Sequence, residues 1–202
     1  MPDLDRAPVF LSASFPSGER GERFRPYDPS GIADAVSAFS RAVLGSNGTL
    51  AFGGHPTITP LVLMISRELR VKESVTIFQS RWFEDLRIPE VDEIAEEELG
   101  FIEWTRKLGD RDESLRIMRE EMIRSRRYAA AVFVGGMEGI SDEYEMMKER
   151  WPDTPCIPVR GPGGAAAKLA GDYTDLGLAG FKRSRAYPFM ALHLVDALAG
   201  AA

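Results

Sequence analysis

Apolar runs of strand length alternate along this chain with amphipathic segments of helix length. Several of the runs are nearly continuous in apolar residues, as expected for strands covered on both faces. Right-handed crossovers through intervening helices bring such strands side by side in a parallel sheet. The alternation therefore predicts an α/β fold, a Rossmann-like, doubly wound parallel sheet in a single domain. The expected strands are residues 8–13, 49–53, 74–79, 129–135 and 154–159, and the expected helices are residues 30–44, 60–69, 112–127, 142–150 and 186–198.

Local signals support two of these helices. The segment 30–44 carries its apolar residues on one stripe, and Ser30 is its expected N-cap. Pro60 opens the segment 60–69 at a first-turn position, where proline is tolerated. We expect these large side chains to lie in the core: Phe39, Met64, Phe133 and Phe189.

Three regions do not fit the alternation. Residues 17–29 are polar, residues 79–110 are rich in acid, and residues 161–182 are rich in glycine and alanine. We interpret them as solvated connections, with a short exposed helix at EIAEEELG, although long loops at strand ends also hold ligands. We expect one domain over residues 1–202, with its core in 8–160 and a C-terminal extension that ends in helix 186–198.

Composition excludes several classes of function. The 202 residues are 44% hydrophobic and 28% charged, which suits one globular core. The formal net charge of −6 argues against a large, sequence-independent affinity for nucleic acid, because no basic surplus is available to release counterions from the phosphates. The N-terminus lacks a signal-peptide pattern, and no segment approaches the ~18 apolar residues of a membrane span. We therefore expect a cytoplasmic protein without membrane contact.

Cysteine and histidine are scarce. A single cysteine, Cys156, excludes an intrachain disulfide and a cysteine-built metal site, and it fits a reducing cytoplasm. Cys156 lies in an apolar run and is expected to be inert packing, while His193 in the apolar final helix is expected to be structural. With only two histidines, far apart, we expect no metal and no cofactor.

Two glycine clusters close apolar runs. In an open parallel sheet the ligand crevice lies at the carboxyl ends of the strands, and glycine there lets backbone N–H groups approach a phosphate. Each cluster alone fits equally a tight turn that needs a positive φ, whereas the two together favour a phosphate cradle. Neither matches the dinucleotide or P-loop pattern, so neither a redox dinucleotide nor ATP hydrolysis is indicated. The residues expected to face the ligand are Gly53, Gly54, His55, Thr57, Gly135, Gly136 and Gly139.

Four stretches, in this order, carry a resemblance to a known family. They are VFLSASFP, LAFGGHPTITP, LRIMREEMIRSRRYAAAVFVGG and GGMEGISDEYE, and they extend from Val9 to Val159. The chain resembles the SLOG superfamily, which includes the Lonely Guy phosphoribohydrolases, the DprA DNA-processing proteins and the nucleotide-sensing domain of the Thoeris anti-phage effector. The resemblance implies a Rossmann-like fold of the SLOG type and a small nucleotide ligand. The DprA-type alternative, binding of DNA, is disfavoured by the acidic balance.

The resemblance to the phosphoribohydrolases implies a catalytic pair. Their hallmark is P-G-G-x-G-T-x-x-E, preceded by a helix with a catalytic arginine. That arginine falls on Arg119, and the glutamate falls on Glu143 if one residue is inserted between Gly136 and Gly139. The sequence departs from the hallmark at two positions, because Val134 replaces proline and Ile140 replaces threonine. The implied reaction is cleavage of the N-glycosidic bond of a nucleoside 5'-monophosphate.

The same residues also resemble the Thoeris sensor domain, whose ligand is an isomer of cyclic ADP-ribose. There the residue that matches Arg119 contacts ligand and performs no chemistry. Ser12 and Ser14 match a phosphate- or ribose-contacting position of the family, and they fit equally a tight turn. A sensor of this length would pass its signal to a separate effector protein. The resemblance also implies a homodimer or larger homo-oligomer, through the Arg119 helix or the last helix.

The chemistry of the pair fits both functions. A carboxylate beside a ribose stabilises positive charge on the sugar and activates water during hydrolysis, and Glu143 is the candidate. An arginine fork offers bidentate donors and does not lose its proton, which suits Arg119 beside phosphate or ribose. The remaining alternative is an ordinary exposed ion pair of little energetic worth. Our first hypothesis is a sensor of an ADP-ribose-like or cyclic ADP-ribose signal, and the alternative is the phosphoribohydrolase.

Overall fold

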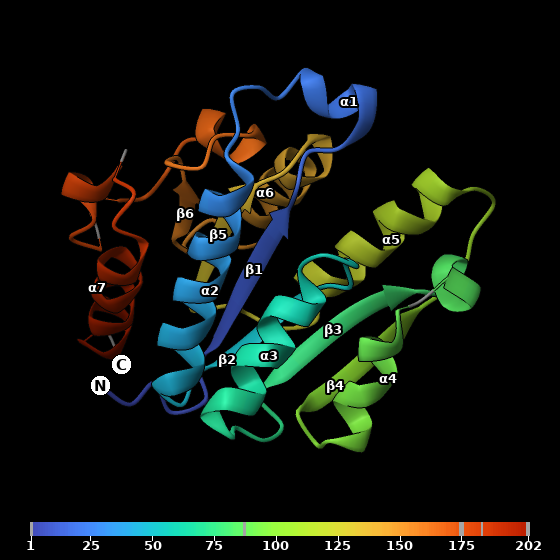
Figure 1. Ribbon diagram of the computed structural model, residues 1–202, viewed down its shortest axis with the longest axis horizontal. Helices are drawn as coiled ribbons and strands as arrows, with labels where there is room; N and C mark the ends of the chain where they lie inside the picture. The colour runs from blue at the N-terminus through green and yellow to red at the C-terminus, as the bar shows by residue number, and fades with distance from the viewer. Residues whose placement is uncertain (1, 87, 174–175, 183, 201–202) are drawn as a thin grey trace.

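A six-stranded sheet forms the centre of the computed structural model, which describes residues 2–86, 88–173, 176–182 and 184–200 (Figure 1). The strand order is β4-β3-β2-β1-β5-β6, and neighbouring strands pair in parallel. The expected Rossmann-like parallel sheet is therefore confirmed. The strands are β1 (Pro8–Ser14), β2 (Thr49–Gly53), β3 (Val75–Ser80), β4 (Gly100–Thr105), β5 (Ala130–Gly135) and β6 (Cys156–Val159).

Helices cover both faces of the sheet. Helices α2, α3, α4 and α7 pack on one face, and α5 and α6 pack on the other, as Figure 1 shows. The α-helices are α1 (Gly18–Glu22), α2 (Pro29–Gly45), α3 (Thr59–Leu69), α4 (Pro89–Glu96), α5 (Arg111–Arg124), α6 (Glu138–Arg150) and α7 (Tyr187–Gly200). Short 3-10 helices are η1 (Arg81–Leu86), η2 (Ala165–Lys168) and η3 (Ala179–Phe181).

Each central strand divides its side chains between two cores. On β1, Leu11 packs into the core beneath α2 and α3, whereas Phe10 packs into the core beneath α5 and α6. Because both sets of side chains leave water, the strand is apolar at consecutive positions. Phe39 and Phe133 are buried, as expected.

Two expected core residues lie on the surface. Met64 is 51% exposed and Phe189 is 65% exposed, so both expectations were wrong. The cause is helical geometry, because the buried stripe of α3 centres on Val62 and Ser66, and Met64 lies on the opposite side of the helix. Phe189 likewise lies opposite the buried stripe of α7.

The region 79–110 contains more regular structure than the sequence indicated. It holds η1, α4 and the edge strand β4, where the sequence predicted a connection with one short helix. Strand β4 was missed because its side chains alternate in exposure, with Phe101 and Glu103 facing water, whereas the other edge strand, β6, is buried at every position. The polar segment 17–29 likewise contains the short helix α1, and the segment 161–182 contains η2 and η3.

Helix ends differ from the expected ones at several places. Helix α2 begins at Pro29 and is capped by Asp28, whose Oδ1 accepts the Gly31 N–H at 3.1 Å, so the expectation of Ser30 as N-cap was wrong. Helix α6 begins at Glu138, one turn before the expected start at residue 142. Pro60 lies in the first turn of α3, as expected.

Three smaller features complete the fold. Cys156 is fully buried at the start of β6, which agrees with its expected packing role. His193 lies on the exposed side of α7, where its ring is 5.1 Å from the ring of Phe181. Of the helices in the described parts of the chain, none has both the length and the apolar character needed to cross a bilayer.

Candidate functional site

A cavity of about 960 Å³ lies at the carboxyl ends of β1, β2 and β3. Helices α5 and α6 form one side of it, and α3, η1 and α4 form the other. Open parallel sheets hold their ligands at this edge, where the loops after the strands meet. The volume is near the top of the range of about 300–1,000 Å³ for small-molecule sites.

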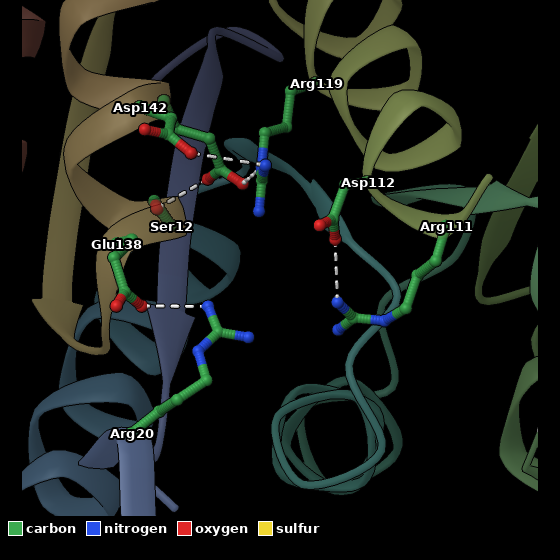
Figure 2. Close-up of polar contacts among 8 residues, drawn as sticks. Ser12, Arg20, Arg111, Asp112, Arg119, Glu138 and Asp142 are labelled. Carbon is green, nitrogen blue, oxygen red and sulfur yellow. Dashed lines mark hydrogen bonds and ion pairs between the residues drawn. The ribbon is translucent and has the colours of Figure 1, made fainter. Parts of the chain in front are cut away.

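Three side chains from separate elements meet on the wall of this cavity. The Ser12 hydroxyl on β1 donates to Oε2 of Glu143 on α6 at 2.6 Å. The Nε–H of Arg119 on α5 donates to the other carboxylate oxygen, Oε1, at 3.3 Å. Arg119 Nη1 also lies 3.4 Å from Oδ2 of Asp142, as Figure 2 shows. The structure thus brings together Ser12, Arg119 and Glu143, which the sequence had placed in one site.

Burial distinguishes this cluster from an ordinary surface ion pair. The side chains of Arg119 and Glu143 are only 19% and 13% exposed. The pKa of Glu143 is raised above its usual value, because burial disfavours the charged carboxylate. The charge of Arg119 and the hydrogen bond from Ser12 both lower this pKa, but burial outweighs them. Glu143 therefore takes up a proton more readily than an exposed glutamate.

The helices that present the cluster have identifiable start signals. Helix α5 begins after Asp110, whose Oδ1 accepts the Glu113 N–H at 2.8 Å. Helix α6 follows the turn at Gly135 and Gly136, which have φ angles of 63° and 70°. Non-glycine residues rarely adopt such angles, so the turn that aims α6 at the cavity depends on these two glycines.

The glycines of this turn serve its geometry. Gly135 and Gly136 are not among the described residues that line the cavity. The Gly136 N–H already donates to the Ser14 carbonyl at 2.8 Å, and a Cβ at Gly136 would overlap the Ile140 side chain. Gly139 differs, because it lines the cavity and a Cβ there would collide with the Arg119 guanidinium. Gly139 therefore makes room for Arg119.

The two glycines at the end of β2, Gly53 and Gly54, border the cavity, and Gly54 also has a structural role. The Gly54 N–H donates to the Phe78 carbonyl at 2.8 Å, so it extends the pairing of β2 with β3. Ser14 also lines the cavity, while its carbonyl accepts the Gly136 N–H.

His55 follows this pair and also lines the cavity. Its Nδ1 accepts the Thr57 N–H at 3.3 Å and lies 2.9 Å from the Thr57 hydroxyl. An acceptor Nδ1 assigns the proton of the neutral ring to Nε2. Burial lowers the pKa of His55, which keeps the ring neutral. Thr57 is exposed and is not among the described lining residues, so it positions His55.

Cationic residues that the sequence analysis did not identify surround the opening. Arg20 Nη2 lies 2.9 Å from Glu138 Oε2, and Arg111 Nη1 lies 3.0 Å from Asp112 Oδ1. In Figure 2, Arg20 on α1 points toward the same space as Arg111 and Arg119, which both lie on α5. Exposed pairs of this kind are weak, so a phosphate can replace a carboxylate partner at low cost. No motif in the sequence marks Arg20 or Arg111.

The opposite side of the cavity comes from the region first interpreted as a solvated connection. This side is lined by Gln79 near the end of β3 and by apolar side chains between η1 and α4, namely Phe83, Leu86, Ile88 and Val91. Pro89, a typical first-turn residue, and the buried spacing of Val91 and Ile94 are the signals that predict α4. Within the described residues, no group of three or more histidine, cysteine or acidic side chains is arranged to hold a metal ion.

Comparison with known proteins adds a family and a fold. A family model described as the SLOG cluster3 family matches residues 24–185. Among solved structures, the chain is similar to the X-ray structure of TM1055, a structural genomics target. The two share 18% identity over 84% of this chain and 80% of that chain, with a TM-score of 0.55, which shows a common fold. None of the curated proteins matches this sequence significantly.

Proposed function

The chain belongs to the SLOG cluster3 family, and from this premise we propose that its cavity binds a nucleotide-derived signal, such as an ADP-ribose-like or cyclic ADP-ribose ligand. The observation that carries the proposal is the Ser12–Glu143–Arg119 cluster on the wall of a cavity of about 960 Å³. The cluster provides a carboxylate and a guanidinium in a partly buried setting, where such groups bind hydroxyls and phosphates more strongly than in water.

Each part of such a ligand has a matching group. The carboxylate oxygens of Glu143 accept hydrogen bonds from ribose hydroxyls, and Arg119 holds the carboxylate in position. The rim arginines, Arg20 and Arg111, supply charge-assisted donors for phosphate oxygens. The first turn of α6 lines the same cavity, and the N-terminus of a helix favours an anion. The ribose therefore lies against Glu143 and the phosphate lies toward the opening.

Hydrolysis is the second candidate, and the raised pKa of Glu143 favours it. In this reaction a water adds to the ribose carbon, the N-glycosidic bond breaks, and the base leaves with a proton. A carboxyl group whose pKa is closer to neutrality is a better proton carrier for such a step. Against this, both Glu143 oxygens already accept hydrogen bonds from Ser12 and Arg119, which suits binding better than activation of water.

A sensor also needs a way to transmit its signal. We propose a homo-oligomer whose contact includes α7, because this helix exposes Phe189 and Leu192 on its outer side. The occupant of that surface is a second copy of the chain, and a separate effector protein reads the liganded state. Light scattering of the wild type and of a Phe189→Glu variant measures the assembly directly.

The single buried thiol of Cys156 fits action in the reducing cytosol.

Chromatography separates the two candidate functions. Purine monophosphates, ADP-ribose and cyclic ADP-ribose are incubated with the wild type, with Glu143→Ala and with Arg150→Ala, an exposed position on the same helix outside the described cavity lining, as a control. As a sensor, the protein leaves every compound intact while it binds at least one of them in calorimetry. Free base produced by the wild type and by Arg150→Ala, but not by Glu143→Ala, would instead make it a phosphoribohydrolase.

A further inference from the structure

The cavity is divided between a charged side and an uncharged side. Every charged side chain in its described lining comes from α1, α5 or α6. The residues contributed by β2, β3, α3, η1 and α4 include only apolar and neutral polar side chains. A phosphate and a ribose suit the first side, whereas a flat, neutral heterocycle suits the second.

Gln79 stands out on the uncharged side. It lies at the end of β3 and is only 6% exposed, yet it lines the cavity. No hydrogen bond joins its side-chain amide to another described residue, and the amide is not among the sealed polar atoms of the core. An amide that borders a cavity and has no partner among the described residues is available to a ligand.

The fold keeps the amide of Gln79 in position. A Cβ at Gly54 would overlap Oε1 of Gln79, so the glycine at the end of β2 leaves the space that the amide occupies. Thus Gly54, expected to approach a phosphate, instead admits a side chain from the neighbouring strand. Phe83, Ile88 and Val91 line the same cavity and add apolar surface to its uncharged side.

We infer that Gln79 reads the base of the bound nucleotide and that Phe83, Ile88 and Val91 enclose it. This inference rests on the proposed function and names the part of the ligand that the second side of the cavity recognises. A glutamine amide has an N–H donor beside a carbonyl acceptor, which complements the adjacent N–H donor and ring-nitrogen acceptor of adenine. The ligand class is therefore an adenine nucleotide, with its base against Gln79 and its ribose against Glu143.

Calorimetry with three probes tests the assignment. Adenosine 5'-monophosphate and ADP-ribose contain the base, whereas ribose 5-phosphate lacks it. The variants are Gln79→Leu, which removes the amide at similar size, and Gln79→Glu, which replaces the N–H donor with a charged acceptor oxygen. Thermal unfolding of each variant confirms that the affinities are measured on folded protein.

The expected result is selective. Both Gln79 variants bind the two adenine-containing probes about tenfold more weakly or worse, which is the effect of a lost bidentate contact. Their affinity for ribose 5-phosphate stays unchanged. Phe83→Ala produces the same selectivity through lost apolar contact. Arg119→Ala weakens all three probes, because it acts on the ribose side.

Different failures identify different errors. Equal losses for all three probes in Gln79→Leu would mean that the side chain only shapes the cavity, and unchanged adenine affinity would mean that the base lies elsewhere. Either result overturns the base assignment while the nucleotide function stands. A wild type that binds none of the three probes overturns both the assignment and the proposed function.

Discussion

Ser12 and Glu143 are 131 positions apart in the chain, yet the Ser12 hydroxyl donates to the Glu143 carboxylate at 2.6 Å. The bond connects the end of β1 to α6 and fixes one carboxylate oxygen, while Arg119 bonds the other. A carboxylate held at both oxygens presents its remaining lone pairs to the cavity in a defined direction. The ribose side of the proposed site therefore depends on the packing of β1 against α5 and α6.

Replacing Ser12 with alanine is expected to raise the pKa of Glu143 further. The Ser12 hydroxyl stabilises the charged carboxylate, so its loss favours the protonated form. The measurement is an NMR titration of the Glu143 carboxyl carbon in the wild type and in Ser12→Ala. Ser14→Ala serves as the control, because Ser14 also lines the cavity. A carboxyl titration that does not move in Ser12→Ala would refute the role of this bond.

Glu143→Gln is expected to gain stability relative to the wild type as the pH rises. Burial raises the folded-state pKa of Glu143 above the unfolded value of about 4.3, so the wild type loses stability as the pH rises from that value through the folded pKa. Glutamine has no proton to lose and escapes this loss. Thermal unfolding of both proteins across a pH series from acid to neutral measures the difference. A constant difference in melting temperature contradicts the predicted shift.

The Cys156 thiol is expected to resist alkylation in the folded protein. It is fully buried, and burial raises its pKa to about 12, so the reactive thiolate is scarce at neutral pH. Mass spectrometry after iodoacetamide treatment at mildly alkaline pH should detect modification only when denaturant is present. Rapid alkylation without denaturant would show that β6 opens readily.

Gly139→Ala is expected to weaken ligand binding without loss of stability. The added Cβ collides with the Arg119 guanidinium and displaces it from Glu143. Alanine in a helix is otherwise favoured over glycine, by up to about 1 kcal/mol. The matched control is Gly136→Ala, which forces alanine into a positive φ of 70° and should lower the melting temperature. Normal affinity in Gly139→Ala would show that Arg119 tolerates displacement.

The fold was largely predictable because its central strands are covered on both faces. Burial on both faces makes β1, β2 and β5 largely apolar, and the edge strand β6 is buried along its whole length as well, a pattern that local sequence reveals. The edge strand β4 has no such coverage, and its exposed Phe101 and Glu103 conceal it. Helix α4 was obscured for a related reason, since only Val91 and Ile94 are buried among its acidic neighbours.

The site was predictable only in part. The resemblance to a family identified Ser12, Arg119 and Glu143, because motif order carries information about residues distant in sequence. Gln79 and Phe83 belong to no motif, and they line the cavity only because β3 ends beside Gly54 and η1 follows that strand at the cavity wall. The roles of Gly135 and Gly136 also depend on the fold, since hydrogen bonding decides whether a glycine N–H is free. Local sequence shows neither which elements meet at the cavity nor which glycine N–H groups are already hydrogen-bonded.

The most direct test of the nucleotide site is calorimetric titration of the wild type and Arg119→Ala with adenosine 5'-monophosphate and ADP-ribose. Arg124→Ala, an exposed residue on the same helix and outside the described cavity lining, is the control. We predict that the wild type and Arg124→Ala bind at least one of these ligands with similar affinity. Arg119→Ala should bind it about tenfold more weakly or worse, the scale of one lost charge-assisted contact. Unchanged affinity in Arg119→Ala would contradict the proposed site.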